Sequence, residues 1–281
     1  MTQEIGVCLW FNSQAKEAAQ FYETVFDDFS MISENPLAVN YKMMGQRFMN
    51  LNGGPIHTIN PSVSFFIEFD AEDSLEKTWN KLIEGGTVMM PLNEYPWSKK
   101  YGWCADKFGV NWQLMIHKGA TSDKLIPNLM FVNANNGLAQ EAINYYTGIF
   151  PESKTIAISK YEKGEPDTEG NIKYSRFLLN GKTFGAMESS YQHKFDFTEG
   201  ISFMVIVDTQ EEIDFYWDKL VEGGKPGRCG WLTDKYGISW QIIPSILGKL
   251  MNDPATAPKA SFAFLQMSKF VIADLIKGAK S

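Results

Sequence analysis

The sequence contains two copies of one pattern, and this repeat limits the folds that the chain can adopt. The stretch DKFGVNWQLMI ends at Ile116, and DKYGISWQIIP ends at Pro244. A longer stretch, SFFIEFDAEDSLEKTWNKLIEGG at Ser64–Gly86, matches SFMVIVDTQEEIDFYWDKLVEGG at Ser202–Gly224 without a gap. A repeat of this length predicts two structurally equivalent units in one chain.

Each copy predicts the same order of helices and strands. Apolar residues recur at helical spacing in residues 15–26 and 139–150, and again in residues 75–83 and 213–221. A Gly-Gly pair follows each of the last two stretches, where glycine supplies a left-handed helix cap. Short alternating runs such as NYKMM, RFMNL and NIKYSRFLL indicate antiparallel strands. The predicted class is α+β, with two β-α-β-β-β modules in each half and four in the chain.

The repeat also sets the predicted unit boundaries. We predict a first unit over residues 1–120, a second over residues 124–250, and a C-terminal helix within residues 251–281 that packs on the body. The polar stretch GATSDK places the boundary near Gly119–Asp123, and we expect each unit to be complete in itself. The last helix should run from about Lys259 to Lys277 and cover its apolar residues, which are Phe262, Leu265, Phe270, Ile272 and Leu275.

Composition excludes several classes of partner and location. The net charge is -7, and no basic stripe is present that would neutralise phosphates, so we expect no nucleic acid partner. No apolar run reaches the length of a membrane span, and the N-terminus lacks the basic start of an export signal. The three cysteines are scattered singly, which is typical of reduced thiols and predicts a cytoplasmic protein.

The order of several motifs resembles a known family. The motifs are LWF, EAAQFYETVF, FMNLNGGP, SFFIEF, LIEGGTVMMPL and YGWCADKFGVNWQL. Together they resemble the PhnB-like branch of the glyoxalase / bleomycin-resistance / vicinal-oxygen-chelate (VOC) superfamily, whose members are often labelled 3-demethylubiquinone-9 3-methyltransferase. The resemblance covers nearly the whole chain. It implies that two β-α-β-β-β modules form an open, eight-stranded sheet that curls around a ligand cavity, with the helices outside.

The closing strand of each copy can be oriented from its alternation. Val110, Trp112 and Leu114 alternate with Asn111 and Gln113, so we expect the first set under helices and the second in a polar cavity. Residues 238–242 repeat this order and place Gln241 in the cavity. In metal-dependent relatives this position is a glutamate that binds a divalent ion, whereas both copies here have glutamine.

The remaining ligand positions that the resemblance implies are almost all neutral. By strand order, a metal would meet Gly6 or Cys8 on the first strand of the first half. Glu188 is the one carboxylate in the set, so we expect no bound catalytic metal or other cofactor, with a divalent metal as the alternative. The other positions that the resemblance implies are Ser64, Ser202 and Asn52.

Aromatic and histidine side chains complete the predicted cavity lining. Trp10 should point into the cavity if a helix covers the opposite face of its strand, and simple core packing remains the alternative. His57 follows a Gly-Gly turn at the expected cavity mouth. Trp103 and Trp231 could stack on a flat ligand or pack the sheet. The same reasoning adds Asn128 and Met130 on the first strand of the second half, and Trp97 in a loop.

That loop, MPLNEYPWSK, is missing from the second half, and its Tyr95, Trp97 and Lys99 could roof a cavity in the first unit. We therefore expect the first unit to bind a small, partly aromatic or carbonyl-containing ligand without a catalytic metal. The alternative is a metal-dependent VOC enzyme of the lyase, isomerase or dioxygenase type. No glycine-rich motif supports a site for S-adenosylmethionine. The fused units replace a homodimer interface, so the chain is a monomeric pseudo-dimer or forms a homodimer.

Overall fold

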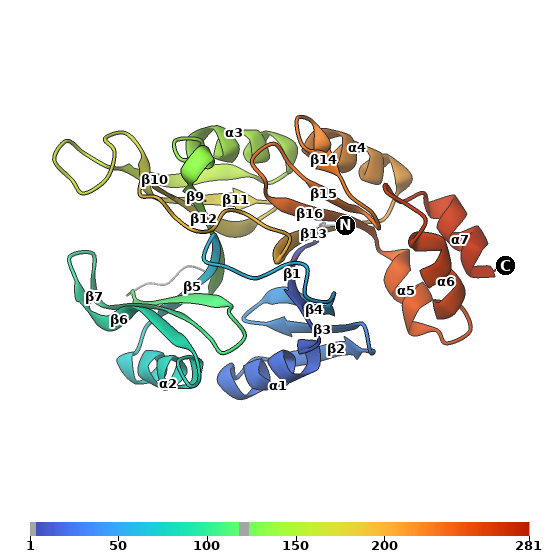
Figure 1. The fold of residues 1–281 in the computed structure, drawn as a ribbon, viewed down its shortest axis with the longest axis horizontal. Helices are drawn as coiled ribbons and strands as arrows, with labels where there is room; N and C mark the ends of the chain where they lie inside the picture. Colours follow the sequence, from blue (N-terminus) through green and yellow to red (C-terminus); the bar gives the residue numbers. More distant parts are fainter. Residues whose placement is uncertain (1–3, 118–123, 281) are drawn as a thin grey trace.

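Two mixed sheets of eight strands each, with seven α-helices, make up the described part of the chain (Figure 1). The computed structural model describes residues 4–117 and 124–280. Sheet A has the order β14 (Lys225–Pro226), β15 (Trp231–Thr233), β16 (Ser239–Pro244), β13 (Ile201–Val207), β1 (Glu4–Phe11), β4 (Gln46–Asn52), β3 (Ala38–Met43), β2 (Ser30–Glu34). Sheet B has the order β10 (Lys154–Lys160), β11 (Ile172–Leu179), β12 (Lys182–Ser189), β9 (Leu125–Val132), β5 (Val63–Phe69), β8 (Asn111–Ile116), β7 (Ser98–Ala105), β6 (Thr87–Tyr95).

The predicted α+β class and the eight-stranded sheets are confirmed, but the expectation that each half forms its own sheet is wrong. Sheet A joins the first module of the first half to the second module of the second half through the antiparallel pair β1–β13. Sheet B joins the two remaining modules through β5–β9. Strands β8 and β9, which are consecutive in the chain, lie in the same sheet on either side of β5. The predicted boundary at residues 119–123 lies outside the described residues.

The four module helices lie in two pairs on opposite sides of the sheets (Figure 1). They are α1 (Ala15–Val25) with α2 (Glu72–Leu82), and α3 (Ala139–Ile149) with α4 (Gln210–Val221). Their predicted apolar faces are buried. In both predicted Gly-Gly caps the first glycine has a left-handed backbone, with φ of 73° at Gly85 and 74° at Gly223.

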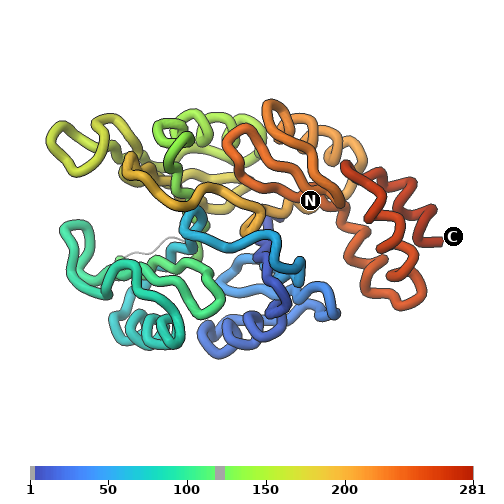
Figure 2. Tube along the Cα trace, viewed as in Figure 1, coloured from blue at the N-terminus to red at the C-terminus, as the bar shows by residue number. Residues whose placement is uncertain are grey.

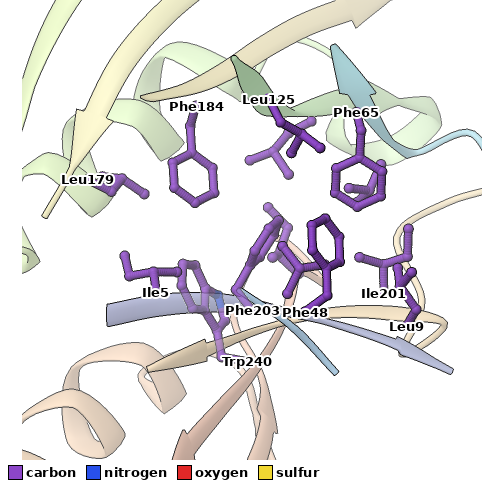
Figure 3. Packing of buried hydrophobic residues seen from close by; sticks show 14 of the residues in the cluster. Ile5, Leu9, Phe48, Phe65, Leu125, Leu179, Phe184, Ile201, Phe203 and Trp240 are labelled. Carbon is purple, nitrogen blue, oxygen red and sulfur yellow. The ribbon is translucent and has the colours of Figure 1, made fainter. Parts of the chain in front are cut away.

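Part of the core lies between the two sheets, where buried side chains of both meet (Figure 3). Phe48 of sheet A meets Phe65 of sheet B with ring centroids 5.4 Å apart. Phe184 and Phe203 repeat this contact at 5.3 Å. Burial of such rings is the main source of stability. One continuous core therefore joins all four modules.

The C-terminal residues form three helices beside sheet A (Figure 2). They are α5 (Ile246–Asn252), α6 (Ala257–Phe264) and α7 (Ile272–Lys280), so the single helix predicted over residues 259–277 is wrong. Between α6 and α7, the carbonyl groups of Met267 and Ser268 accept hydrogen bonds from the backbone N–H groups of residues 229 and 230. Ile272 is half-buried, whereas Phe270 and Leu275 are buried as predicted; Phe262 and Leu265 are exposed, against the prediction.

None of the helices in residues 4–117 and 124–280 is both long enough and apolar enough to cross a membrane.

Candidate functional site

A cavity opens on the concave face of sheet A. Its volume is about 780 Å³, within the usual range for small-molecule sites. Residues of β1, β4, β13 and β16 line its floor, and residues of α5 and α6 close one side. Most of the wall is apolar and comes from both halves of the chain, including Met49, Leu51, Met204, Ile206, Ile243, Leu247, Met251, Phe264 and Phe270.

Three aromatic rings meet in this sheet A cavity. Trp10 and Trp231 lie edge to face with ring centroids 5.7 Å apart, and the ring of His57 lies 4.7 Å from that of Trp10. The indole N–H of Trp10 donates to the carbonyl oxygen of Gly54 over 2.7 Å. Nδ1 of His57 lies 3.3 Å from the carboxylate of Glu199, which comes from the other half. The rings are thus held in fixed orientations at the cavity wall.

The floor of the cavity is polar at one point. The amide nitrogen of Gln241 donates to the hydroxyl of Ser202 over 2.9 Å, and the thiol of Cys8 lies within hydrogen-bonding reach of both. Burial raises the pKa of the Cys8 thiol to about 12. Because the thiolate is the reactive form, Cys8 is a poor nucleophile here.

The cavity therefore brings together five of the predicted lining residues, with two more directly beneath them. The five are Trp10, Asn52, His57, Trp231 and Gln241, and the two are Cys8 and Ser202.

The concave face of sheet B carries most of the other predicted residues, and side chains fill it. Gln113 donates to the Ser64 hydroxyl and accepts from the Tyr101 hydroxyl, both over 2.7 Å. The indole N–H of Trp103 donates to the amide oxygen of Asn111 over 3.2 Å. The predicted residues on this sheet or its β6–β7 turn are Ser64, Trp97, Trp103, Gln113, Asn128 and Met130.

The cavity that we predicted within the first half is therefore shared between the halves, and the predicted roof lies elsewhere. Tyr95 and Trp97 pack on Tyr101 over sheet B, with ring centroids 5.6 and 5.7 Å from it. Lys99 lies on β7 of the same sheet. The exchange of modules explains the difference, because the module that carries the long loop is in sheet B. The module that lacks the loop is in sheet A, where the cavity stays open.

Asn52 and Glu188, which we predicted at equivalent ligand positions, are indeed equivalent, but both are used to start helices. The side-chain oxygen of Asn52 accepts from the backbone N–H of Ala15, and that of Glu188 from Ala139, each over 2.9 Å. Free N–H groups at a helix N-terminus need such acceptors. Glu188 also accepts from the backbone of Ile172. Its carboxylate is directed at the start of α3 and away from the concave face.

The residues on the sheet A floor do not fit a catalytic divalent metal. Gly6, Cys8, Ser202 and Gln241 supply no carboxylate or imidazole, and neutral amide and hydroxyl oxygens alone bind such ions weakly. In residues 4–117 and 124–280, no group of three or more His, Cys, Asp or Glu side chains is placed to hold a metal ion.

Sequence comparison now identifies the family. The profile described as 3-demethylubiquinone-9 3-methyltransferase matches residues 3–115 and 123–243. The chain belongs to this family. No curated protein matches it at a significant level.

Two solved structures, one short and one long, are similar to this family member. A putative 3-demethylubiquinone-9 3-methyltransferase, PhnB protein, from Bacillus cereus is 31% identical, covering 40% of this chain and 98% of its own, with a TM-score of 0.38. Glyoxalase I from Zea mays is 11% identical, covering 89% of this chain and 96% of its own, with a TM-score of 0.58. The second likeness shows that the tandem fold is similar to that of glyoxalase I.

Several cavity residues of this family member were missed from sequence. Leu247, Met251 and Phe264 belong to C-terminal helices whose docking site the repeat does not encode. Arg228 lies at the cavity in the short connection before β15. The sequence did contain one indication of these residues, which is the loop missing from the second module of the second half. Without this loop, the side of the cavity formed by that module is open to the C-terminal helices.

Proposed function

We propose that the sheet A cavity binds a small, partly aromatic or carbonyl-containing molecule without a catalytic metal. The observation that carries the proposal is the cavity itself, which is large, mostly apolar and lined by the rings of Trp10 and Trp231. Sites for small molecules combine an apolar wall with a few fixed polar groups. Gln241 on the floor and the His57–Glu199 pair at the wall are such groups.

The alternative is a metal-dependent VOC enzyme. Such an enzyme needs about three charged or imidazole ligands on its inner strands. The neutral floor of sheet A gives this alternative less support. Methyl transfer, which the family description names, needs a methyl donor, and the sequence contains no glycine-rich motif for S-adenosylmethionine.

The test is to identify what the purified protein carries. Mass spectrometry under non-denaturing conditions should find a bound small molecule, and elemental analysis should find well under one metal ion per chain. Ile206→Trp fills the cavity and should remove the molecule, whereas Phe215→Trp, on the exposed face of α4, should retain it. Stoichiometric metal that raises thermal stability would favour the enzyme alternative. A molecule that Ile206→Trp does not displace would contradict the proposed site.

A further inference from the structure

The concave faces of the two sheets are formed by residues at equivalent positions of the repeat. The contacts on one face can therefore be compared with those on the other. Gln241 pairs with Trp231 in sheet A, as Gln113 pairs with Trp103 in sheet B. In both sheets the glutamine amide nitrogen donates to a serine hydroxyl on the neighbouring strand, over 2.9 Å in sheet A and 2.7 Å in sheet B. The two floors thus have the same polar centre.

One difference between the two floors removes a hydrogen bond to the glutamine. The repeat aligns YGW, which starts at Tyr101, with CGW, which starts at Cys229. In sheet B the Tyr101 hydroxyl donates to the amide oxygen of Gln113 over 2.7 Å. In sheet A, Cys229 lines the cavity and is too short to supply this donor. Among the described residues, no hydroxyl or N–H group donates to the amide oxygen of Gln241, whose amide nitrogen donates to Ser202.

Two neighbours of Tyr101 in sheet B are also replaced by smaller or uncharged side chains in sheet A. Phe66, in ring contact with Tyr101, aligns with Met204 in the repeat. Glu68, which forms a buried ion pair with Arg176 in sheet B, aligns with Ile206. These replacements remove a ring and a charge, and both Met204 and Ile206 line the cavity. Sheet A therefore keeps the hydrogen-bonding floor of sheet B but lacks the phenol that occupies it.

We propose that the sheet A cavity binds a hydroxyl-bearing aromatic molecule, a phenol, whose ring takes the place of the Tyr101 ring in sheet B and whose hydroxyl donates to the amide oxygen of Gln241. The proposal rests on the proposed function, in which this cavity binds a small molecule. Gln241 lines the cavity, so its amide oxygen is open to a ligand, and a ligand hydroxyl can supply the donor that this oxygen lacks. The ring would contact Met204 and Trp231, and the cavity is large enough for a second ring or a side chain beyond the phenol.

A pair of matched probes tests the hydroxyl. 2-Naphthol and 2-methoxynaphthalene have the same ring system, but only the first can donate a hydrogen bond. Isothermal titration calorimetry should show that the protein binds 2-naphthol about tenfold more tightly, which is the worth of one buried hydrogen bond. Gln241→Leu should remove this preference and leave the affinity for 2-methoxynaphthalene nearly unchanged.

A second pair of variants tests the position. Cys229 has a left-handed backbone, with φ of 56°, so Cys229→Tyr places a phenol at the aligned position without reproducing the strand geometry of Tyr101. The bulk of this phenol at the cavity wall should weaken binding of both probes, whereas Cys229→Ser, which stays small, should bind them as the natural protein does. Equal affinity of the natural protein for both probes would overturn the phenol proposal and leave the proposed function standing. Binding that survives Cys229→Tyr unchanged would also overturn it. If neither probe binds and the purified protein carries no molecule, both proposals fail.

Discussion

The hydroxyl of Tyr22 donates to the carboxylate of Asp106 over 2.9 Å and joins α1, which packs on sheet A, to the β7–β8 turn of sheet B. The equivalent pair, Tyr146 and Asp234, does the same over 2.6 Å. Each aspartate also accepts from a tryptophan indole and two backbone N–H groups. This contact explains the repeated DK-x-G-x-x-W stretch, because it ties each half of the chain across both sheets.

The first prediction concerns Tyr22→Phe. The variant removes one of four hydrogen bonds to the buried carboxylate of Asp106, so the free energy of unfolding should fall by about 1–3 kcal/mol. Urea denaturation measures the loss. Tyr191→Phe is the control, because the Tyr191 ring is exposed and water can replace its hydrogen bond to Pro166. Equal losses in the two variants would contradict a special role for the buried pair.

The second prediction concerns pH. Burial raises the pKa of Asp234 to about 6, and the hydrogen bonds it accepts only partly oppose this. The folded state therefore binds a proton more tightly than the unfolded state, and this group's contribution to stability should grow as pH falls from about 6 to about 4. Compared with Asp234→Asn, which cannot titrate, the natural protein should gain about 2–3 kcal/mol over this range. Urea denaturation at several pH values measures the difference, and a constant difference would contradict the raised pKa.

The local structure was predictable from sequence because it depends on neighbouring residues. The buried faces of α1 to α4 follow from apolar spacing, and the glycine caps follow from backbone geometry. The pairing of modules was not predictable in this way. Ser202 on β13 and Ser64 on β5 occupy equivalent strand positions, so either strand could pair with β1 at Cys8. Both pairings would keep the apolar residues of β1 on one face, so the sequence pattern does not choose between them.

The site was predictable to the same extent. Trp10 and Gln241 were placed on a cavity by strand alternation, which is a local signal. The sequence did not predict which sheet has the open cavity, because this depends on which side chains fill each concave face. The Tyr101 side chain occupies the concave face of sheet B, whereas the shorter Cys229 leaves space on that of sheet A. The sequence shows this difference, but it locates the cavity only when the sheet to which each module belongs is known.

The third prediction concerns the buried ion pair between Glu68 and Arg176, which links β5 to β11 across the two halves. Arg176→Met leaves a buried carboxylate without its cation and should cost about 3–5 kcal/mol in urea denaturation. Adding Glu68→Leu to this variant should recover most of the loss, because the uncompensated charge is then removed. If the double variant is less stable than Arg176→Met, the pair does not act through buried charge.

The last prediction concerns the C-terminal helices. The Leu275 side chain on α7 is fully buried, whereas Phe262 on α6 is 72% exposed. Leu275→Ala should therefore lower the free energy of unfolding by about 2–5 kcal/mol, because it removes buried methyl groups and leaves a cavity. Phe262→Ala, the matched control, should change it by less than about 0.5 kcal/mol.

Truncation before Ala257 removes Phe264 and Phe270 from the cavity wall, so it should lower the melting temperature and weaken ligand binding together. An unchanged melting temperature after truncation would show that α6 and α7 do not stabilise the body.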